Sequence, residues 1–107
     1  MPRSPHKNSD ALFAALGDET RLRLVARLSG EGPLSITRLT AGSSITRQAI
    51  TKHLRVMEHA RLLHKTRRGR ESLWQLDEAR LQEASRYLDQ ISKHWDDALL
   101  RLQRLVE

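Results

Sequence analysis

The sequence predicts a small, mainly helical domain that carries one short β-hairpin and ends in a long helix. Three observations lead to this fold class. Apolar residues recur at helical spacing between Thr46 and Ala60, and again at spacings of three and four from Leu81 to Leu105. Between these segments, two short runs of strand-forming residues flank Gly69. The 107 residues are enough for one domain with a modest core.

The composition is strongly basic and lacks cysteine. The net charge is +6 and the pI is about 10.7, which favours an anionic partner, most commonly nucleic acid. Without cysteine the chain has no disulfide, no thiol nucleophile and no cysteine metal site. This composition fits a reducing cytoplasm, where we expect the protein to reside. No cofactor is predicted.

The sequence contains no predicted targeting or membrane segment. The longest apolar run, residues 11–16, falls far short of the roughly 20 residues that a membrane span needs. Residues 1–9 are polar with two prolines and lack the apolar stretch of a secretory signal. We expect residues 1–9 to form a flexible N-terminal arm and residues 10–107 to form the folded domain.

Two helices are expected at the start of the domain. Residues 11–16 form the first, and Gly17 ends it as a left-handed C-cap. Asp18 caps the second, which covers residues 19–28. Its predicted inner stripe consists of Leu22, Val25, Ala26 and Leu28.

The middle of the chain predicts a strand, a short helix and a turn. Residues 30–33 break the second helix, and residues 34–36 alternate in polarity like a short strand. Thr37 can cap a short helix that ends near Ala41, and residues 42–44 form the turn that follows. A short helix, a brief turn and a longer helix with a polar outer face form a helix-turn-helix arrangement.

The helix from Thr46 to Ala60 has two contrasting faces. Ile50, Leu54 and Met57 share its apolar face. The outward face carries Arg47, Gln48, Thr51, Lys52 and Arg55, side chains that bond base edges and phosphates in a major groove. The alternative is an ordinary surface helix whose charges face water.

A basic hairpin follows this helix. The predicted strands are residues 62–67 and 71–76, and Gly69 at the tip allows positive φ. Residues 47–70 hold eight Lys or Arg against one acid, whereas residues 77–107 hold five against seven acids. Such a concentration favours a wing that lies along a phosphate backbone or in a minor groove.

The last helix is expected from residue 78 to about residue 105, capped by Asp77. Its apolar positions sustain an a/d pattern over more than three heptads. One chain is too small to cover the whole stripe, so we expect a second copy to cover it, helped by the first helix. The predicted dimer interface comprises Leu12, Phe13, Leu81, Ala84, Leu88, Ile91, Trp95, Ala98, Leu102 and Leu105. The alternative is a helix folded entirely onto its own core.

Residues 15–28 and 47–76 together resemble the winged helix-turn-helix repressors of the ArsR/SmtB type. The segments carrying the resemblance are Leu16-Gly17-Asp18-Glu19-Thr20-Arg21, Thr51-Lys52-His53-Leu54 and Arg67-Arg68-Gly69-Arg70. The resemblance covers about residues 10–105. It implies a homodimeric DNA-binding repressor with the order helix, helix, strand, helix, helix, two hairpin strands, helix. Members commonly release DNA when an inducer binds, often a metal ion.

The chain departs from this family in its sensor residues. Members that respond to arsenic or cadmium hold a thiolate site in the short helix before the turn, and this chain has no cysteine. A zinc-type site in the last helix has only His94 and Asp97 as weak candidates, because Asp89 lies about 140° from His94 around the helix. Ile91 replaces the histidine of the family's Asp-x-His pair. The Trp95 region resembles a subset of the family whose inducer is generally unclear.

Three further histidines invite a metal interpretation. His53 and His59 are about 120° apart around their helix, and His64 lies beyond its end, so a shared site is not expected. By the family pattern, His53 supports the helix or meets a phosphate. No paired-carboxylate, Ser-His-Asp or glycine-rich phosphate signature is present at suitable spacing, so we predict no enzymatic activity.

The sequence therefore predicts a homodimeric transcriptional repressor that binds double-stranded DNA and does not associate with a membrane. The sequence does not identify its inducer. The predicted DNA contacts are Ser44, Thr46, Arg47, Gln48, Thr51, Lys52, His53, Arg55, Lys65, Arg67, Arg68 and Arg70. One alternative is an interaction module whose basic face binds an acidic protein. Another is a sensor gated by metal or by a small organic inducer in a cleft by the last helix.

Overall fold

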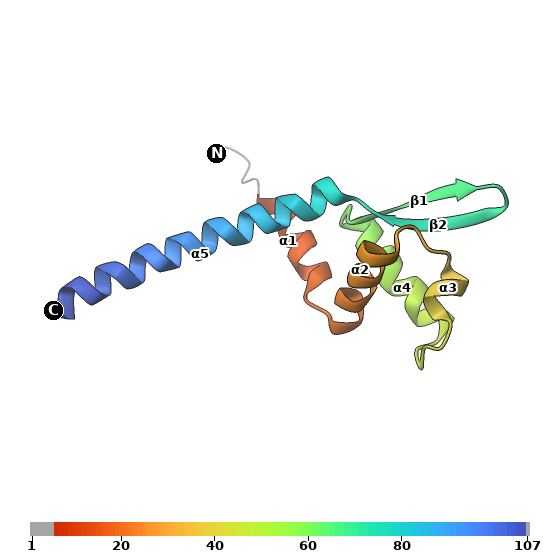
Figure 1. Ribbon diagram of the computed structural model, residues 1–107, viewed down its shortest axis with the longest axis horizontal. Coiled ribbons are helices and arrows are strands. Elements are labelled where there is room, and N and C mark those ends of the chain that lie inside the picture. The colour runs from red at the N-terminus through yellow and green to blue at the C-terminus, as the bar shows by residue number, and fades with distance from the viewer. Residues whose placement is uncertain (1–5, 107) are drawn as a thin grey trace.

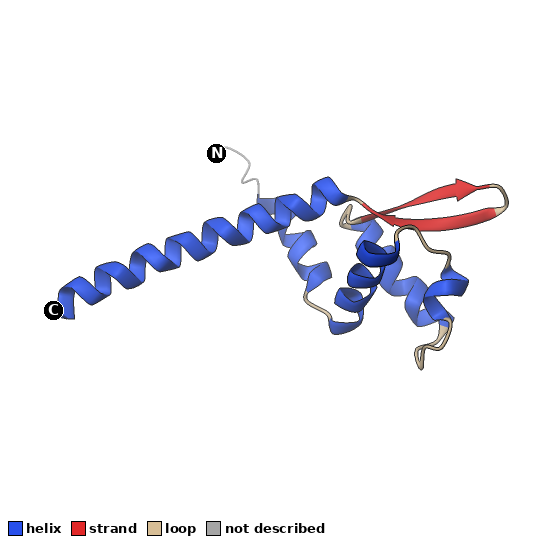
Figure 2. Ribbon diagram, in the orientation of Figure 1, coloured by secondary structure: helices blue, strands red, loops and turns tan. Residues whose placement is uncertain are grey.

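The computed structural model describes residues 6–106, which form five helices and one two-stranded antiparallel sheet (Figure 1). The helices are α1 (His6–Leu16), α2 (Glu19–Glu31), α3 (Ile36–Thr40), α4 (Arg47–His59) and α5 (Glu78–Val106), and the strands are β1 (Leu63–Arg68) and β2 (Glu71–Leu76). The molecule measures 64 × 35 × 21 Å. The long α5 and the hairpin extend in opposite directions from the cluster formed by the other helices (Figure 2).

The core lies where α1, α2 and α4 meet the base of the hairpin and the start of α5. The predicted apolar stripe of α4 is confirmed, because Ile50, Leu54 and Met57 are all buried. Leu62 and Trp74 from the hairpin region and Ala84 from α5 complete this cluster. The same stripe therefore both builds the core and turns the opposite face of α4 outward.

Helix α1 ends at Leu16 as predicted, but its start and the conformation of Gly17 differ from the prediction. It begins at His6, five residues before the expected start, while residues 1–5 lie outside the described part of the chain. Gly17 does not have a positive φ, so the expected left-handed cap is wrong. Instead, the Arg21 guanidinium donates to the carbonyl oxygens of Ala15 at 2.6 Å and Ala14 at 3.3 Å, which satisfies the last turn of the helix.

Helix α2 is longer than predicted and turned differently. It continues to Glu31, where Gly32 at φ 84° ends it and donates its N–H to the Leu28 carbonyl at 3.0 Å. The predicted inner residues Leu22 and Ala26 are exposed, Leu22 by 49%. The buried face consists of Leu24, Val25 and Leu28. The prediction is therefore confirmed for Val25 and Leu28 and wrong for Leu22 and Ala26.

The predicted third strand at residues 34–36 is wrong. Leu34 forms a single antiparallel bridge with Trp74, in which Leu34 N–H donates at 3.0 Å and Trp74 N–H donates at 2.8 Å. Pro33 has no N–H to donate on one side. On the other side Ser35, rather than Thr37, caps α3, since its hydroxyl accepts from the Arg38 N–H at 3.2 Å. Leu34 is therefore the one residue of this segment that pairs with β2.

The hairpin forms as predicted, with β1 shifted by one residue. The register runs from Leu63 opposite Leu76 to Arg68 opposite Glu71. Gly69 and Arg70 make the two-residue loop, and Gly69 has φ 63°, the positive value that tight hairpin turns require.

Helix α5 begins where predicted, because the Asp77 carboxylate accepts from the Arg80 N–H at 3.1 Å. Ala84 is buried against the core, but the large apolar side chains from Leu88 onward are exposed and Ala98 is half-buried. The C-terminal half of α5 projects beyond the rest of the molecule (Figure 1). Within residues 6–106, every helix is too short or too polar to span a bilayer.

Leu54→Ala should lower the free energy of unfolding by about 3 kcal/mol, because it leaves a cavity at a fully buried position. Leu22→Ala on the exposed side of α2 is the control and should cost less than about 1 kcal/mol. Urea unfolding followed by circular dichroism, at one protein concentration, measures both. Equal losses in the two variants would contradict the core described above.

Candidate nucleic-acid interface

The outer face of α4 is built by the burial of its opposite face. Thr46 caps the helix, since its hydroxyl accepts from the Ala49 N–H at 3.1 Å. A shallow depression of about 440 Å³ on the outer face is lined by Arg47, Gln48, Thr51, Lys52 and Arg55. All of these except Thr51 are exposed. The Thr51 hydroxyl donates to the Arg47 carbonyl at 2.8 Å and keeps acceptor capacity for a ligand.

A side chain of α2 bonds the end of α3, just before the turn that leads to α4. The Arg27 guanidinium donates to the carbonyl oxygens of Arg38 at 3.1 Å and Leu39 at 3.3 Å, at the end of α3. It also pairs with Glu31 at 2.7 Å. Ser44, a predicted DNA contact, is exposed in this turn. α3 and α4 therefore have the helix-turn-helix arrangement that the sequence predicted.

His53 occupies a different place from the other predicted contacts. Its side chain is mostly covered, and Nδ1 lies 3.2 Å from the Arg21 guanidinium and 4.0 Å from the Asp18 carboxylate. The imidazole therefore points toward α2 rather than toward the outer face. This placement favours the supporting role for His53, one of the two roles that the sequence left open.

Arg21 is the residue that the sequence analysis missed. Its guanidinium reaches both the end of α1 and His53 on α4, so it fixes these two helices to α2. A signal was present in the sequence, because Arg21 lies three residues after the capping Asp18, on the first turn of a helix that follows another helix directly. Its partner His53 is 32 residues away, and this separation hides the contact.

Among the described residues, Asp18 is the one whose pKa clearly departs from its ordinary value. The N–H of Arg21 donates to its carboxylate at 3.0 Å, and this bond, aided by the charges of Arg21 and His53, lowers the pKa of Asp18 below 3.8. A carboxyl whose pKa is lowered by folding stabilises the folded state above its ordinary pKa. That contribution disappears as the pH falls through the folded-state pKa.

Asp18→Asn keeps a capping side chain but removes the charge. The wild type should be the more stable protein near neutral pH. Its advantage over the variant should shrink between about pH 5 and about pH 3, as the carboxylate takes up its proton. Urea unfolding of both proteins across this range measures the difference. Curves that stay parallel down to the lowest pH would show that the Asp18 charge contributes nothing.

The basic side chains of the hairpin differ in their positions and contacts. Arg67, Arg68 and Arg70 are exposed near the tip. Lys65 lies nearer the base, where its Nζ sits 4.8 Å from the centroid of the Trp74 ring. The three arginines are therefore better placed for a backbone phosphate than Lys65.

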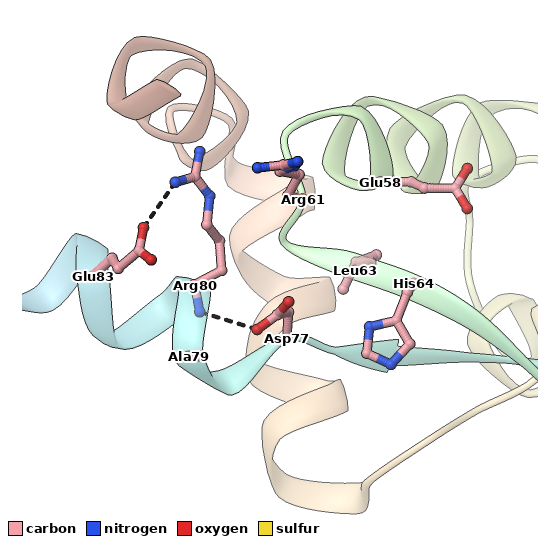
Figure 3. Close-up of a pocket in the computed structure, with 8 residues that line it drawn as sticks. All are labelled: Glu58, Arg61, Leu63, His64, Asp77, Ala79, Arg80 and Glu83. Carbon is pink, nitrogen blue, oxygen red and sulfur yellow. Dashed lines mark hydrogen bonds and ion pairs between the residues drawn. The ribbon is translucent and has the colours of Figure 1, made fainter. Parts of the chain in front are cut away.

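A polar pocket of about 510 Å³ joins the end of α4 to the start of α5 (Figure 3). The Arg80 guanidinium donates to the Ala60 carbonyl at 3.2 Å and pairs with Glu83 at 2.9 Å. Arg61 takes the left-handed conformation at φ 65°, and its N–H donates to the Glu58 carbonyl at 3.0 Å. Among residues 6–106, no three acidic, histidine or cysteine side chains are placed to hold a metal ion. The hydrogen bond from Arg80 to Ala60 in the wall of this pocket connects the start of α5 to the end of α4.

The apolar stripe of α5 is divided into a buried and an exposed part. Ala84 is buried with Leu12 in the core of its own chain, and Phe13 packs on Tyr87 with ring centroids 5.3 Å apart. The predicted interface residues that remain exposed by more than a third are Leu88, Ile91, Trp95, Leu102 and Leu105. The sequence analysis missed Leu99, which is also 55% exposed.

Comparison with known proteins identifies the class. A family model described as a helix-turn-helix domain matches residues 16–66. The chain is 45% identical over 69 residues to the HTH-type transcriptional regulator YuzN of Bacillus subtilis, covering 59% of this chain and 75% of that protein. It is 32% identical over 104 residues to the HTH-type transcriptional regulator Rv2034 of Mycobacterium tuberculosis, covering 97% and 94%. The class is a transcriptional regulator with a helix-turn-helix DNA-binding domain.

Solved structures narrow this class. An ArsR-like transcriptional regulator from Rhodococcus sp. RHA1 is 31% identical, covers 95% of each chain and superposes with a TM-score of 0.81. The homodimeric winged helix-turn-helix DNA-binding domain Mb0332 of Mycobacterium bovis shares the fold at 14% identity, with a TM-score of 0.62 over 92% of each chain. The chain belongs to the ArsR-type winged helix-turn-helix transcriptional regulators, and the family resemblance of the sequence is confirmed.

Proposed function

We propose that this protein is a homodimeric repressor that binds an inverted-repeat operator with α4 in the major groove and the hairpin along the phosphate backbone. The observation that carries the proposal is the outer face of α4, where exposed donors stand opposite a fully buried stripe. Repression is what the ArsR/SmtB resemblance implies. The absence of cysteine supports a regulator without a thiolate sensor.

The proposed contacts divide into two kinds. Arg47, Gln48, Thr51 and Lys52 face outward along α4 and read base edges. Ser44 and Thr46 precede the helix N-terminus, where backbone N–H groups favour a phosphate. The remaining phosphate contacts are Arg55, Arg67, Arg68 and Arg70, with Lys65 as the weakest because of its position over Trp74. Phosphate contacts set affinity and register, and base contacts set sequence choice.

The dimer is supported by the exposed stripe of α5. Residues 88–106 extend for about 27 Å at the helical rise, and large apolar side chains follow one face over that length. A contiguous apolar surface of this size is unusual on a free monomer. Two copies joined along α5 would place their α4 helices at successive major grooves, roughly 34 Å apart, if they read one face of the duplex.

Gln48→Ala and Arg68→Ala should separate the two kinds of contact. Gln48→Ala should reduce the preference for operator over scrambled DNA by about tenfold, because a base contact carries about 1–3 kcal/mol of discrimination. Arg68→Ala should weaken binding to operator and to scrambled DNA by the same factor. It should also reduce the slope of log affinity against log salt concentration by about one unit per subunit. Fluorescence anisotropy with the upstream DNA of its own gene, in chelator and over a salt series, measures both.

The control in this experiment is the wild type on both duplexes. Selective, steeply salt-dependent binding without metal supports the proposed repressor. An Arg68→Ala protein with altered operator preference and unchanged binding to scrambled DNA would refute the wing assignment.

Trp95→Glu should convert the dimer to a monomer at micromolar concentration, because it places a charge in the exposed apolar stripe. Lys93→Glu is the matched control, since Lys93 lies about 160° around the helix from Trp95 and should leave the dimer intact. Sedimentation velocity measures the oligomeric state. Loss of bivalency should also weaken operator binding on the order of a hundredfold. A dimer that survives Trp95→Glu would place the interface elsewhere.

A further inference from the structure

An apolar groove of about 480 Å³ runs between α1 and α4, beside the DNA-facing side chains. Its floor is made by Ala11, Ala14, Ala15, Val56 and Ala60. Its remaining lining residues are Arg21, Lys52, Arg55 and His59. The groove therefore combines an apolar floor with basic side chains, and none of the nine lining residues is acidic.

The groove exists because α1 presents alanine where it faces α4. An alanine side chain ends at Cβ, so it cannot fill the space between the two helices. Val56 is left 38% exposed on α4, among residues that otherwise face water with charged groups. A phosphate backbone offers no apolar partner to such a side chain, so DNA binding leaves the floor unexplained. Its volume lies within the range of ordinary small-molecule sites.

The basic residues determine the charge of the ligand. Lys52 and Arg55 are both exposed on α4, one turn apart, and His59 follows one turn later. The Arg21 guanidinium is already engaged by the carbonyls of Ala14 and Ala15, so it contributes positive potential rather than a new hydrogen bond. An anionic group above Lys52 and Arg55 is electrostatically favoured there.

We propose that this groove binds an organic anion with an apolar body, of the alkyl carboxylate class, and that the bound anion displaces DNA. The apolar chain would cover the alanine floor and Val56, while the carboxylate would lie at Lys52 and Arg55. The second half of this proposal rests on the proposed function, because Lys52 and Arg55 are then also DNA contacts. One ligand would remove two cations from the DNA-facing surface at each subunit.

Octanoate is the probe, titrated into the full chain without DNA and followed by amide chemical shifts. Saturable shifts should concentrate at residues 11–15 and 52–60. Neutral 1-octanol should bind at least about fivefold more weakly, since it has no charge to pair with the two exposed cations. Equal binding of acid and alcohol, or shifts confined to α5, would overturn the proposal.

Ala14→Phe fills the groove and should weaken octanoate at least about tenfold, because the apolar chain loses its site. Ala11→Phe fills it from the preceding turn and serves if the first variant does not fold. Ala26→Phe adds the same ring to an exposed position on α2 and should bind octanoate like the wild type. Equal loss in Ala14→Phe and Ala26→Phe would refute the site.

The same variants test displacement from DNA at constant ionic strength, with sodium chloride as the anion control. Octanoate at three times its own dissociation constant should raise the wild-type dissociation constant for DNA about fourfold per subunit by competition, and so about sixteenfold for a dimer whose two grooves must both be empty. It should leave Ala14→Phe unaffected. Unchanged DNA affinity in the wild type would overturn the displacement.

The two proposals fail separately. Absence of any DNA binding would refute the proposed function, while the titration without DNA would still decide on the groove. Octanoate binding that appears only in the monomeric Trp95→Glu protein would show that a second copy covers the groove, and would overturn the proposal.

Discussion

The placement of α4 depends on one guanidinium. Arg21 bonds the last carbonyls of α1 and reaches the His53 imidazole of α4, while its own helix is capped by Asp18 beside the same histidine. A charged group bonded to several partners is costly to displace, because each partner would lose its hydrogen bond in a partly buried place. α4 is thus oriented by the contact between Arg21 and His53 as well as by its apolar stripe. Both features lie on the side of α4 away from its outer face.

This separation of faces explains how one short helix serves stability and recognition together. Leu54 and Met57 are fully buried, whereas Arg47 and Gln48, about two to three turns earlier, are exposed. Substitutions on the outer face therefore leave the core packing intact, and the chain can change what it binds without refolding. The exposed Val56 departs from this division, because it places an apolar side chain on the polar side, next to the alanines of α1.

Elements governed by local pattern were predictable from the sequence, and those decided by distant partners were not. The stripe of α4, the hairpin around Gly69 and the start of α5 at Asp77 each follow from residues within a turn or two. The strand predicted at residues 34–36 did not form, because the segment makes one bridge, to Trp74 far along the chain. The inner face of α2 was predicted in part: Val25 and Leu28 are buried, but packing against other elements buries Leu24 in place of Leu22 and Ala26. The outward side chains of the site were predictable, but the contact that holds them was not.

The junction between α4 and α5 determines how the exposed apolar stripe of α5 is placed relative to the outer face of α4. The Arg80 guanidinium donates to the Ala60 carbonyl at the end of α4, and the Asp77 N–H donates to the Leu62 carbonyl at 2.8 Å. Both bonds join the start of α5 to residues 60–62, which connect α4 to β1, so they restrict movement of α5 relative to α4. In the proposed dimer, a rigid junction of this kind would make the crossing of the two α5 helices set the spacing of the two α4 helices. The α1–α4 groove is lined by none of the residues of this junction except Ala60, so the proposed ligand would act on Lys52 and Arg55 directly, with no change in the proposed dimer.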